Sequence, residues 1–247
     1  AKQMADKQTN KVTQVAQTNA PPPVVKTNTP PVPAVVTNTP PAPKPAAADL
    51  FPIPRSGISL DISKLSVIGK RDAPNRFVSM FDYTCHLCRK LHGFVRQVMP
   101  NHKDTLACFL VPMPLDAECN KQFKSTSPSH VNACEYAKIC LAVQQVAPEK
   151  YDAFDQWLFS EHETAKPLEL VRNHAEKLVG KEALGQALVS ATLQTQLQRN
   201  IEIYELNFKN WNSSNMPQTF IKNQVIFGPP PTAKILEDHL KKEFDLK

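Results

Sequence analysis

The chain has 247 residues, of which 41% are hydrophobic, so it is long enough for one large domain or two small ones with a buried core. Its net charge of +6 is spread out, with no long basic run and no basic–aromatic interleaving, which argues for a solvated surface and against a nucleic-acid partner. No stretch approaches the roughly 18 apolar residues of a membrane-spanning helix.

Residues 1–49 are predicted to form a disordered, proline-rich linker. The first 20 or so are polar and cannot bury a core. An imperfect repeat follows, in which Val-Val-Lys-Thr-Asn-Thr-Pro-Pro at 24–31 returns as Val-Val-Thr-Asn-Thr-Pro-Pro at 35–41. Such sequence favours extended polyproline II and serves as a semi-rigid spacer, with a docking site for a proline-binding module as the alternative. Because the sequence opens on Ala1 and not Met, we also expect an upstream segment, either a targeting sequence or one that tethers the protein to a membrane.

The first half of the folded part is predicted to contain a β-α-β unit. Alternating apolar and polar residues over 58–62 predict a half-buried strand, and a turn over 67–74 leads into an apolar strand over 77–81. A helix that ends by Pro100 separates this strand from another apolar run at 106–111, which we expect to be a strand buried on both faces. The two strands should therefore be parallel neighbours with a right-handed crossover.

Residues 129–210 are predicted to form a helical insertion within a folded domain that spans residues 50–247. Prolines suit the first turns of two of its helices, and Gly180 suits a C-terminal cap. The chain then returns to two strands joined by a short hairpin connection and ends in an amphipathic helix. The inserted helices are predicted over 130–146, 148–159, 167–179 and 181–208, the hairpin strands over 218–221 and 225–227, and the final helix over 233–244.

The centre of the chain is a pair of cysteines, Cys85 and Cys88, where the strand over 77–81 gives way to a helix. Thr84 is placed to cap that helix, so both cysteines fall in its first turn, where unpaired N–H groups and the positive dipole end favour an anion. A thiolate is such an anion, and we expect Cys85 to be the exposed nucleophile with a lowered pKa. Cys88 is expected to be its buried partner in a small disulfide, as in reversible dithiol exchange.

A zinc site is the alternative for this pair, because His92 follows Cys88 at the i+4 position. A closed zinc site wants four ligands, usually from two paired motifs, and the sequence has no second CxxC, so we expect no bound metal and no cofactor. Haem attachment would need a histidine where Arg89 stands. His86 is expected, when protonated, to stabilise the Cys85 thiolate, with an exposed spacer as the alternative. The remaining histidines are predicted to lie on the surface.

Four further cysteines bring the total to six, which suggests an oxidising compartment such as the periplasm. We expect a disulfide between Cys119 and Cys134 that pins an irregular loop to the first inserted helix. In the chain-entropy model, a loop of about 15 residues corresponds to about 3 kcal/mol of stabilisation. Cys108 and Cys140 are expected to be thiols, with a second bridge as one alternative and four ordinary buried thiols as another.

The order of strand, CxxC helix, strand, helical insertion, hairpin and final helix resembles that of DsbA-like thiol–disulfide oxidoreductases. The resemblance covers about residues 57–247 and implies an α/β, thioredoxin-like fold with a central mixed sheet and an inserted helical subdomain. It also implies that the Met216–Pro217 bond is cis and lies beside Cys85, with Pro217 shaping the groove and Met216 offering a soft apolar contact. The residues that carry it are Ile68-Gly69, Asp72-Ala73-Pro74, Phe81-Asp82-Tyr83-Thr84-Cys85, Cys88-Arg89, Met216-Pro217-Gln218-Thr219-Phe220-Ile221 and Asn223-Gln224-Val225.

The chain departs from the family's pattern at three positions. Proline commonly follows the first cysteine, but here the intervening residues are His86 and Leu87, which influence the redox poise and leave the direction of electron flow open. Many thioredoxin-like enzymes carry a buried acid six residues before the first cysteine. This chain has Ser79 there, so proton transfer would need water or another group. Met216 stands where a small or β-branched residue is frequent.

Two functions from different classes fit these features. The first is an extracytoplasmic, periplasmic thiol–disulfide oxidoreductase in which Cys85 forms a mixed disulfide and Cys88 resolves it. Its partners would be secreted or periplasmic cysteine-containing proteins and a redox partner that resets the pair, for which the resemblance allows a membrane protein. The second is a tethered, non-catalytic thioredoxin-like binding domain in which the CxxC pair is incidental.

Overall fold

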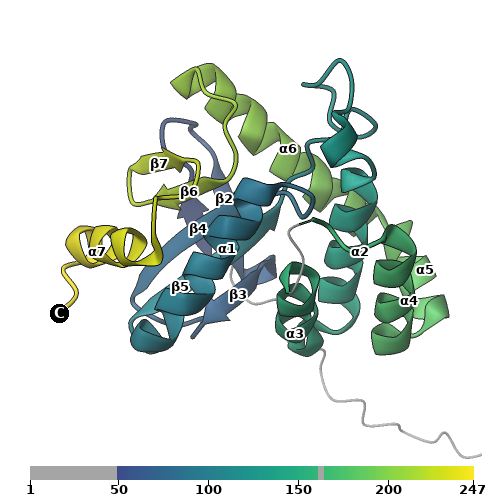
Figure 1. The fold of residues 1–247 in the computed structure, drawn as a ribbon, viewed down its shortest axis with the longest axis horizontal. Helices are drawn as coiled ribbons and strands as arrows, with labels where there is room; N and C mark the ends of the chain where they lie inside the picture. The colour runs from purple at the N-terminus through teal and green to yellow at the C-terminus, as the bar shows by residue number, and fades with distance from the viewer. Residues whose placement is uncertain (1–48, 161–163) are drawn as a thin grey trace, which may run out of the picture. The chain divides into compact units, whose positions relative to one another are not determined.

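A computed structural model describes residues 49–160 and 164–247 (Figure 1). The predicted linker over residues 1–49 therefore lies, except for Asp49, outside the described residues. A mixed sheet of five strands, in the order β3-β5-β4-β6-β7, forms the centre of the described domain. Its strands are β3 (Ser66–Gly69), β4 (Asn75–Phe81), β5 (Leu106–Pro112), β6 (Gln218–Ile221) and β7 (Gln224–Phe227).

The predicted β-α-β unit consists of β4, α1 (His86–Val98) and β5, and its two strands are parallel neighbours. Every residue of β5 is buried, and the strand is paired on both edges, with β4 on one side and antiparallel β3 on the other. Because β6 pairs antiparallel with the other edge of β4, β4 is the middle strand. α1 thus starts beyond the carboxyl end of the middle strand, the edge at which open α/β sheets place their functional groups.

The segment over residues 67–74, predicted to be a turn, is partly a strand, because β3 occupies its first residues and pairs with β5. β3 ends at Gly69, whose φ is 92°. A Cβ atom at this position would lie 2.6 Å from the carbonyl oxygen of Leu106, so only glycine fits against the next strand here. The charged residues that suggested a turn come directly after this point.

The half-buried strand predicted over 58–62 is shorter than expected. β2 (Ser59–Asp61) pairs antiparallel with β1 (Leu50–Pro52) in a separate two-stranded sheet. Ile62–Lys64 forms a 3-10 helix instead of continuing the strand, because the Asp61 side chain accepts a hydrogen bond from the backbone of Ser63 and caps it.

The helical insertion runs from α2 to α6, and α2 packs against each of the other four helices. Figure 1 shows α2 to α5 gathered beside the sheet, while α7 lies near α1. The helix predicted over 181–208 is two helices, because the chain breaks at Val189 and the Ser190 hydroxyl then caps α6. The bounds are α2 (Ala133–Val146), α3 (Pro148–Phe159), α4 (Leu168–Val179), α5 (Lys181–Leu188), α6 (Ala191–Trp211) and α7 (Ala233–Phe244). In the described part of the chain, no helix is both long and apolar enough to cross a bilayer.

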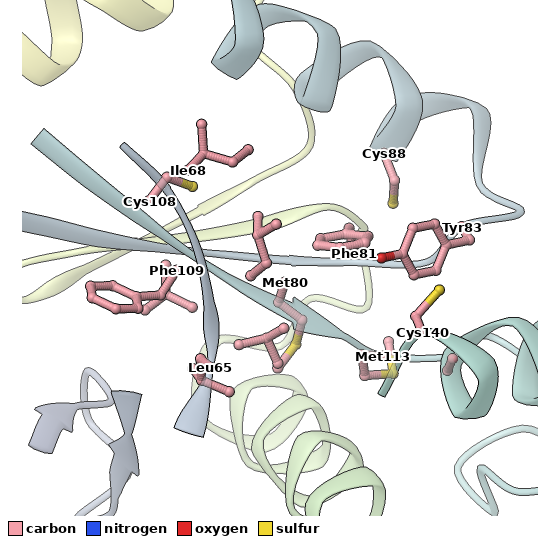
Figure 2. Close-up of a cluster of buried hydrophobic side chains, with 14 of the residues drawn as sticks. Leu65, Ile68, Met80, Phe81, Tyr83, Cys88, Cys108, Phe109, Met113 and Cys140 are labelled. Atoms are coloured by element: carbon pink, nitrogen blue, oxygen red, sulfur yellow. The ribbon is translucent and has the colours of Figure 1, made fainter. Parts of the chain in front are cut away.

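The hydrophobic core reaches from the sheet to the cysteine pair. Figure 2 shows Cys88 and Cys140 on opposite sides of the Phe81 and Tyr83 rings, which meet edge to face with their centroids 5.0 Å apart. Cys140 and Cys108 are free, fully buried thiols, and burial raises the pKa of both. Neither is therefore suited to act as a thiolate near neutral pH.

Candidate active site

The Cys85 turn (residues 82–85) connects β4 to α1 and differs from the prediction in its cap. Cys85, and not Thr84, is the N-cap residue: its Sγ accepts a hydrogen bond from the backbone N–H of Cys88 at 3.4 Å. Thr84 instead donates its hydroxyl and its backbone N–H to Oδ1 of Asp82, both at 2.6 Å. The Cys85 sulfur therefore lies directly at the N-terminus of α1, where the helix dipole stabilises negative charge.

The two cysteines differ in their affinity for a proton. Hydrogen bonds from the side chain and the backbone N–H of Cys88 lower the pKa of the Cys85 thiol, although burial acts in the opposite direction. Burial raises the pKa of Cys88 well above its usual value, and the neighbouring Cys85 raises it further. The prediction of an exposed nucleophile is wrong, since Cys85 is only 6% exposed and Cys88 1%. The segments around the Cys85 turn cover the sulfur and leave it as part of a pocket wall.

Asp82 is a buried acid that the sequence reasoning missed. It is 2% exposed. Oδ1 accepts the two hydrogen bonds from Thr84, and Oδ2 accepts a third from the backbone N–H of Leu115 at 2.6 Å. Burial raises the pKa of this carboxyl group against the effect of these hydrogen bonds. Its backbone N–H donates to Sγ of Cys88 at 3.4 Å, so an acid stands next to the pair although Ser79 supplies none. The Asp-x-Thr spacing is typical of an Asx-turn and could have identified it.

His130 is a second site residue that the sequence reasoning missed. Its Nδ1 lies 2.9 Å from Oγ1 of Thr84, across a sequence separation of 46 residues. The prediction that the remaining histidines lie on the surface is also wrong for His92 and His102, which are buried and lie next to carboxylates. No spacing rule connects His130 to the Cys85 turn, because the contact depends on the folded loop that carries it.

That loop, the disulfide-closed loop (residues 113–132), joins β5 to α2. A disulfide between Cys119 and Cys134 closes it, as predicted, with an S–S distance of 2.11 Å and a Cα–Cα distance of 6.0 Å. Inside it, the buried carboxylate of Asp116 accepts a hydrogen bond from the hydroxyl of Thr126 at 2.6 Å. His130 lies between the two bridged cysteines. The disulfide therefore closes the segment that brings an imidazole to the Cys85 turn.

A pocket of about 390 Å³ lies beside Cys85. The Cys85 turn and the start of α1 form one part of its wall, the disulfide-closed loop a second, and the segments flanking the β6–β7 hairpin a third. The Met216–Pro217 bond is cis, as predicted, and Met216 lines the same pocket as Cys85. Leu87, 38% exposed, adds an apolar side chain. The lining residues are Cys85, His86, Leu87, Leu115, Ser129, His130, Ser214, Asn215, Met216 and Gly228.

A buried polar network joins α1 to α3 behind the cysteine pair. Asp155, which is 0% exposed, accepts hydrogen bonds from Arg96 at 2.7 Å and from the Tyr83 hydroxyl at 2.9 Å, and lies 3.1 Å from Nε2 of His92. Burial alone would raise the pKa of Asp155, but His92 and Arg96 outweigh it and hold that pKa below its usual value. His92, the third ligand of the alternative zinc site, is thus engaged elsewhere. Within residues 49–160 and 164–247, no group of three or more His, Cys, Asp and Glu side chains is arranged to hold a metal ion.

Comparison with known proteins identifies the fold. No protein-family model matches the chain, and neither does any curated protein. The solved catalytic domain of Proteus mirabilis ScsC matches with a TM-score of 0.55 and 20% identity, over 74% of this chain and 90% of that one. A periplasmic thioredoxin-like protein from Salmonella enterica serovar Typhimurium gives a TM-score of 0.54 at 18% identity, over 74% of this chain and 91% of that one. The thiol-disulfide exchange protein alpha-DsbA2 from Wolbachia pipientis matches with a TM-score of 0.55 and 16% identity, over 72% of this chain and 86% of that one.

The chain therefore has a thioredoxin-like fold with an inserted helical subdomain. This is the arrangement of the DsbA-like proteins that the sequence predicted, and it places the CxxC pair at the start of the helix after the middle strand.

The difference in pKa between the two cysteines predicts that alkylating reagents modify Cys85 first. An ordinary thiol is less than about 1% thiolate at pH 6, so the lowered pKa of Cys85 should make it react at least about tenfold faster than Cys88, whose pKa is raised. Short pulses of iodoacetamide on the reduced protein, followed by peptide mass analysis, measure both rates. Faster labelling of Cys88, or labelling of Cys85 only above about pH 8, would contradict the assignment.

Proposed function

We propose that the protein is an extracytoplasmic thiol–disulfide oxidoreductase that exchanges disulfides with cysteine-containing proteins through Cys85 and Cys88. The observation that carries the proposal is the position of the pair at one helix N-terminus, where Sγ of Cys85 caps α1 and accepts the backbone N–H of Cys88 at 3.4 Å, while Cys88 itself is fully buried. The lowered pKa of Cys85 favours its thiolate form and makes it a good leaving group, and the raised pKa of Cys88 keeps it protonated until it is needed.

The exchange conserves atoms and electrons in both directions. In reduction, the Cys85 thiolate attacks one sulfur of a substrate disulfide, that S–S bond breaks, and the other substrate sulfur leaves as a thiolate. Cys88 then attacks Sγ of Cys85, the bond between Cys85 and the substrate breaks, and the Cys85–Cys88 disulfide forms. The proton of Cys88 ends on the departing substrate sulfur, so the substrate leaves reduced. In oxidation, the same bonds form and break in reverse order.

The pocket supplies the contacts for an extended substrate. Met216 brings a soft apolar side chain to the same pocket as Cys85, and Leu87 adds a second. In the proposed complex Pro217 shapes this groove, and the backbone at Met216 pairs with the substrate as a strand would. His86 lines the pocket beside Cys85, where its protonated form would stabilise the thiolate.

The partners follow from this chemistry. The substrates are secreted or periplasmic proteins with cysteines, and a second redox protein, in the membrane or outside it, resets the pair after each cycle. The Cys119–Cys134 disulfide supports an oxidising compartment, most simply the periplasm. In this proposal the proline-rich segment is the spacer that holds the domain away from a membrane anchor.

Reduction of insulin by dithiothreitol, followed by turbidity, tests the proposed activity. The protein should shorten the lag before precipitation, and Cys85→Ser should return it to that of dithiothreitol alone, because the nucleophile is missing. Equal lag times with and without the protein would favour the alternative of a non-catalytic binding domain. An unchanged effect of Cys85→Ser would exclude Cys85 as the nucleophile.

A further inference from the structure

Hydrogen bonds connect the Cys85 turn to both ends of the disulfide-closed loop. At one end of the loop, the backbone N–H of Leu115 donates to Oδ2 of Asp82 at 2.6 Å. At the other end, Nδ1 of His130 lies 2.9 Å from Oγ1 of Thr84, which is itself bonded to Oδ1 of Asp82 at 2.6 Å. Asp82 thus holds both ends of the loop, one directly and one through Thr84.

This hydrogen-bond network determines which nitrogen of the His130 imidazole carries a proton. A threonine hydroxyl has one hydrogen, and Thr84 donates it to the carboxylate of Asp82. While Asp82 is ionised, Oγ1 of Thr84 can therefore only accept from His130, so that Nδ1 carries its hydrogen and acts as the donor. In the neutral imidazole, Nε2 is then left with the free lone pair. Among the described residues, Nε2 of His130 makes no hydrogen bond, and His130 lines the same pocket as Cys85.

We propose that His130 is an acid–base residue of the exchange reaction, with Nε2 taking the proton from a substrate thiol or returning it. This inference rests on the proposed function and assigns to a named atom a role that the cysteine pair alone does not fill. Asp82 and Thr84 act through His130 and are positioning residues, since they fix its tautomer and orientation. The arrangement follows the logic by which a carboxylate orients a catalytic histidine, with a hydroxyl inserted between the two.

The proton balance is simple when a substrate thiol reacts with the oxidised pair. The thiol gives its proton to Nε2 of His130 as its sulfur attacks Sγ of Cys85. A bond forms between these two sulfurs, the Cys85–Cys88 bond breaks, and its electron pair stays on Cys88. In the opposite direction, the imidazolium of His130 returns the proton to the substrate sulfur that leaves Cys85.

The charges around His130 favour this role. The Asp82 carboxyl group is connected to it through Thr84 and, when ionised, attracts a positive charge on the imidazole. The titratable groups at the start of α1 in the same pocket are its N-cap Cys85 and His86, and the disulfide-closed loop contributes the buried Asp116. Arg89 of α1 is directed to the backbone carbonyls of Tyr83 and Leu158. The wall at Met216 is made of uncharged residues.

Reduced glutathione as the substrate thiol tests this proposal. The rate at which it opens the Cys85–Cys88 disulfide is measured by acid quenching and mass analysis from about pH 6 to pH 9.5. A thiol with a pKa of about 8.5 is a few per cent thiolate at pH 7, so a local base accelerates its attack by at most about 30-fold. We expect His130→Gln to slow the reaction about tenfold at pH 7 and less than about twofold at pH 9.5, where the thiol ionises without help.

Matched variants separate this role from a structural one. Thr84→Val removes the hydroxyl that fixes the His130 tautomer, so it should reproduce part of the decrease in rate that His130→Gln shows near pH 7. Thr84→Ser keeps a hydroxyl and should react at the wild-type rate. His174→Gln, in α4 and outside the pocket, should leave the profile unchanged. A loss of equal size at every pH, or no loss in His130→Gln, would overturn the proposal. If the wild-type pair does not react with glutathione at all, it is the proposed function that fails.

Discussion

Replacing Cys88 by Ser is expected to convert short-lived mixed disulfides into stable adducts. Cys88 lies next to Cys85 in the first turn of α1, so its attack on the mixed disulfide is intramolecular and has a very high effective concentration. Without it, release depends on external thiols at millimolar concentration or below. We expect the lifetime of a Cys85–substrate disulfide to increase by on the order of 10³-fold or more, since effective molarities of well-oriented groups reach about 10⁵–10⁸ M.

The lifetime is measured by mixing the Cys88→Ser variant with a disulfide-containing peptide and following the adduct by non-reducing mass analysis. The Cys85→Ser variant is the matched control, because it keeps one cysteine of the pair and should form no adduct. Adducts of equal lifetime in wild type and Cys88→Ser would show that Cys88 does not resolve the intermediate. An adduct in Cys85→Ser would place the nucleophile elsewhere.

Asp155→Ala is expected to destabilise the fold by about 3–5 kcal/mol, the usual cost of removing one partner from a buried charge pair. The substitution leaves Arg96 without its buried carboxylate and takes an acceptor from the Tyr83 hydroxyl. Asp152→Ala is the control, because Asp152 also binds Arg96 but its side chain is 58% exposed. Exposed ion pairs contribute about 0–1 kcal/mol to the free energy of unfolding. Urea unfolding measures both free energies, and equal effects of the two substitutions would contradict a special role of the buried network.

The pH dependence of the same network has a definite sign. Because the folded pKa of Asp155 lies below its unfolded value, the folded state binds fewer protons at this group. Its contribution to the free energy of unfolding is fully present above the unfolded pKa of about 3.9 and is lost as the pH falls through the lower, folded value. The wild type should therefore lose stability below about pH 4 relative to Asp155→Ala. Parallel curves of the free energy of unfolding against pH for the two proteins would contradict this assignment.

Elements with strong local signals could be predicted from the sequence. α3 and α7 begin and end at the predicted residues, because Pro148 suits a first turn and the Thr232 hydroxyl caps α7. The sequence does not predict β3, because this strand has only four residues and ends in glycine. The charged segment that follows gives the region the composition of a turn. The break between α5 and α6 has no Gly or Pro to mark it, and its one local signal is Ser190, whose hydroxyl caps α6.

The candidate site was predictable only as far as local sequence reaches. The CxxC spacing identified Cys85 and Cys88, but Thr84 was assigned as the cap because it is a good capping residue. In the structure, a more distant group, His130, and the buried acid Asp82 engage Thr84, and Cys85 takes the cap position. Contacts of this kind depend on a loop closed by tertiary packing, which no periodicity encodes.

Equilibration of the Cys85–Cys88 pair in glutathione redox buffers tests the central claim most directly. The fraction of disulfide, read by acid quenching and mass analysis with the Cys119–Cys134 bridge intact, gives the reduction potential. We expect one two-electron transition between about −270 mV, as for a thioredoxin-like reductant, and about −120 mV, as for a DsbA-like oxidant. The position within this range decides the direction of electron flow. A pair that forms no Cys85–Cys88 disulfide at any ratio of oxidised to reduced glutathione would contradict the claim.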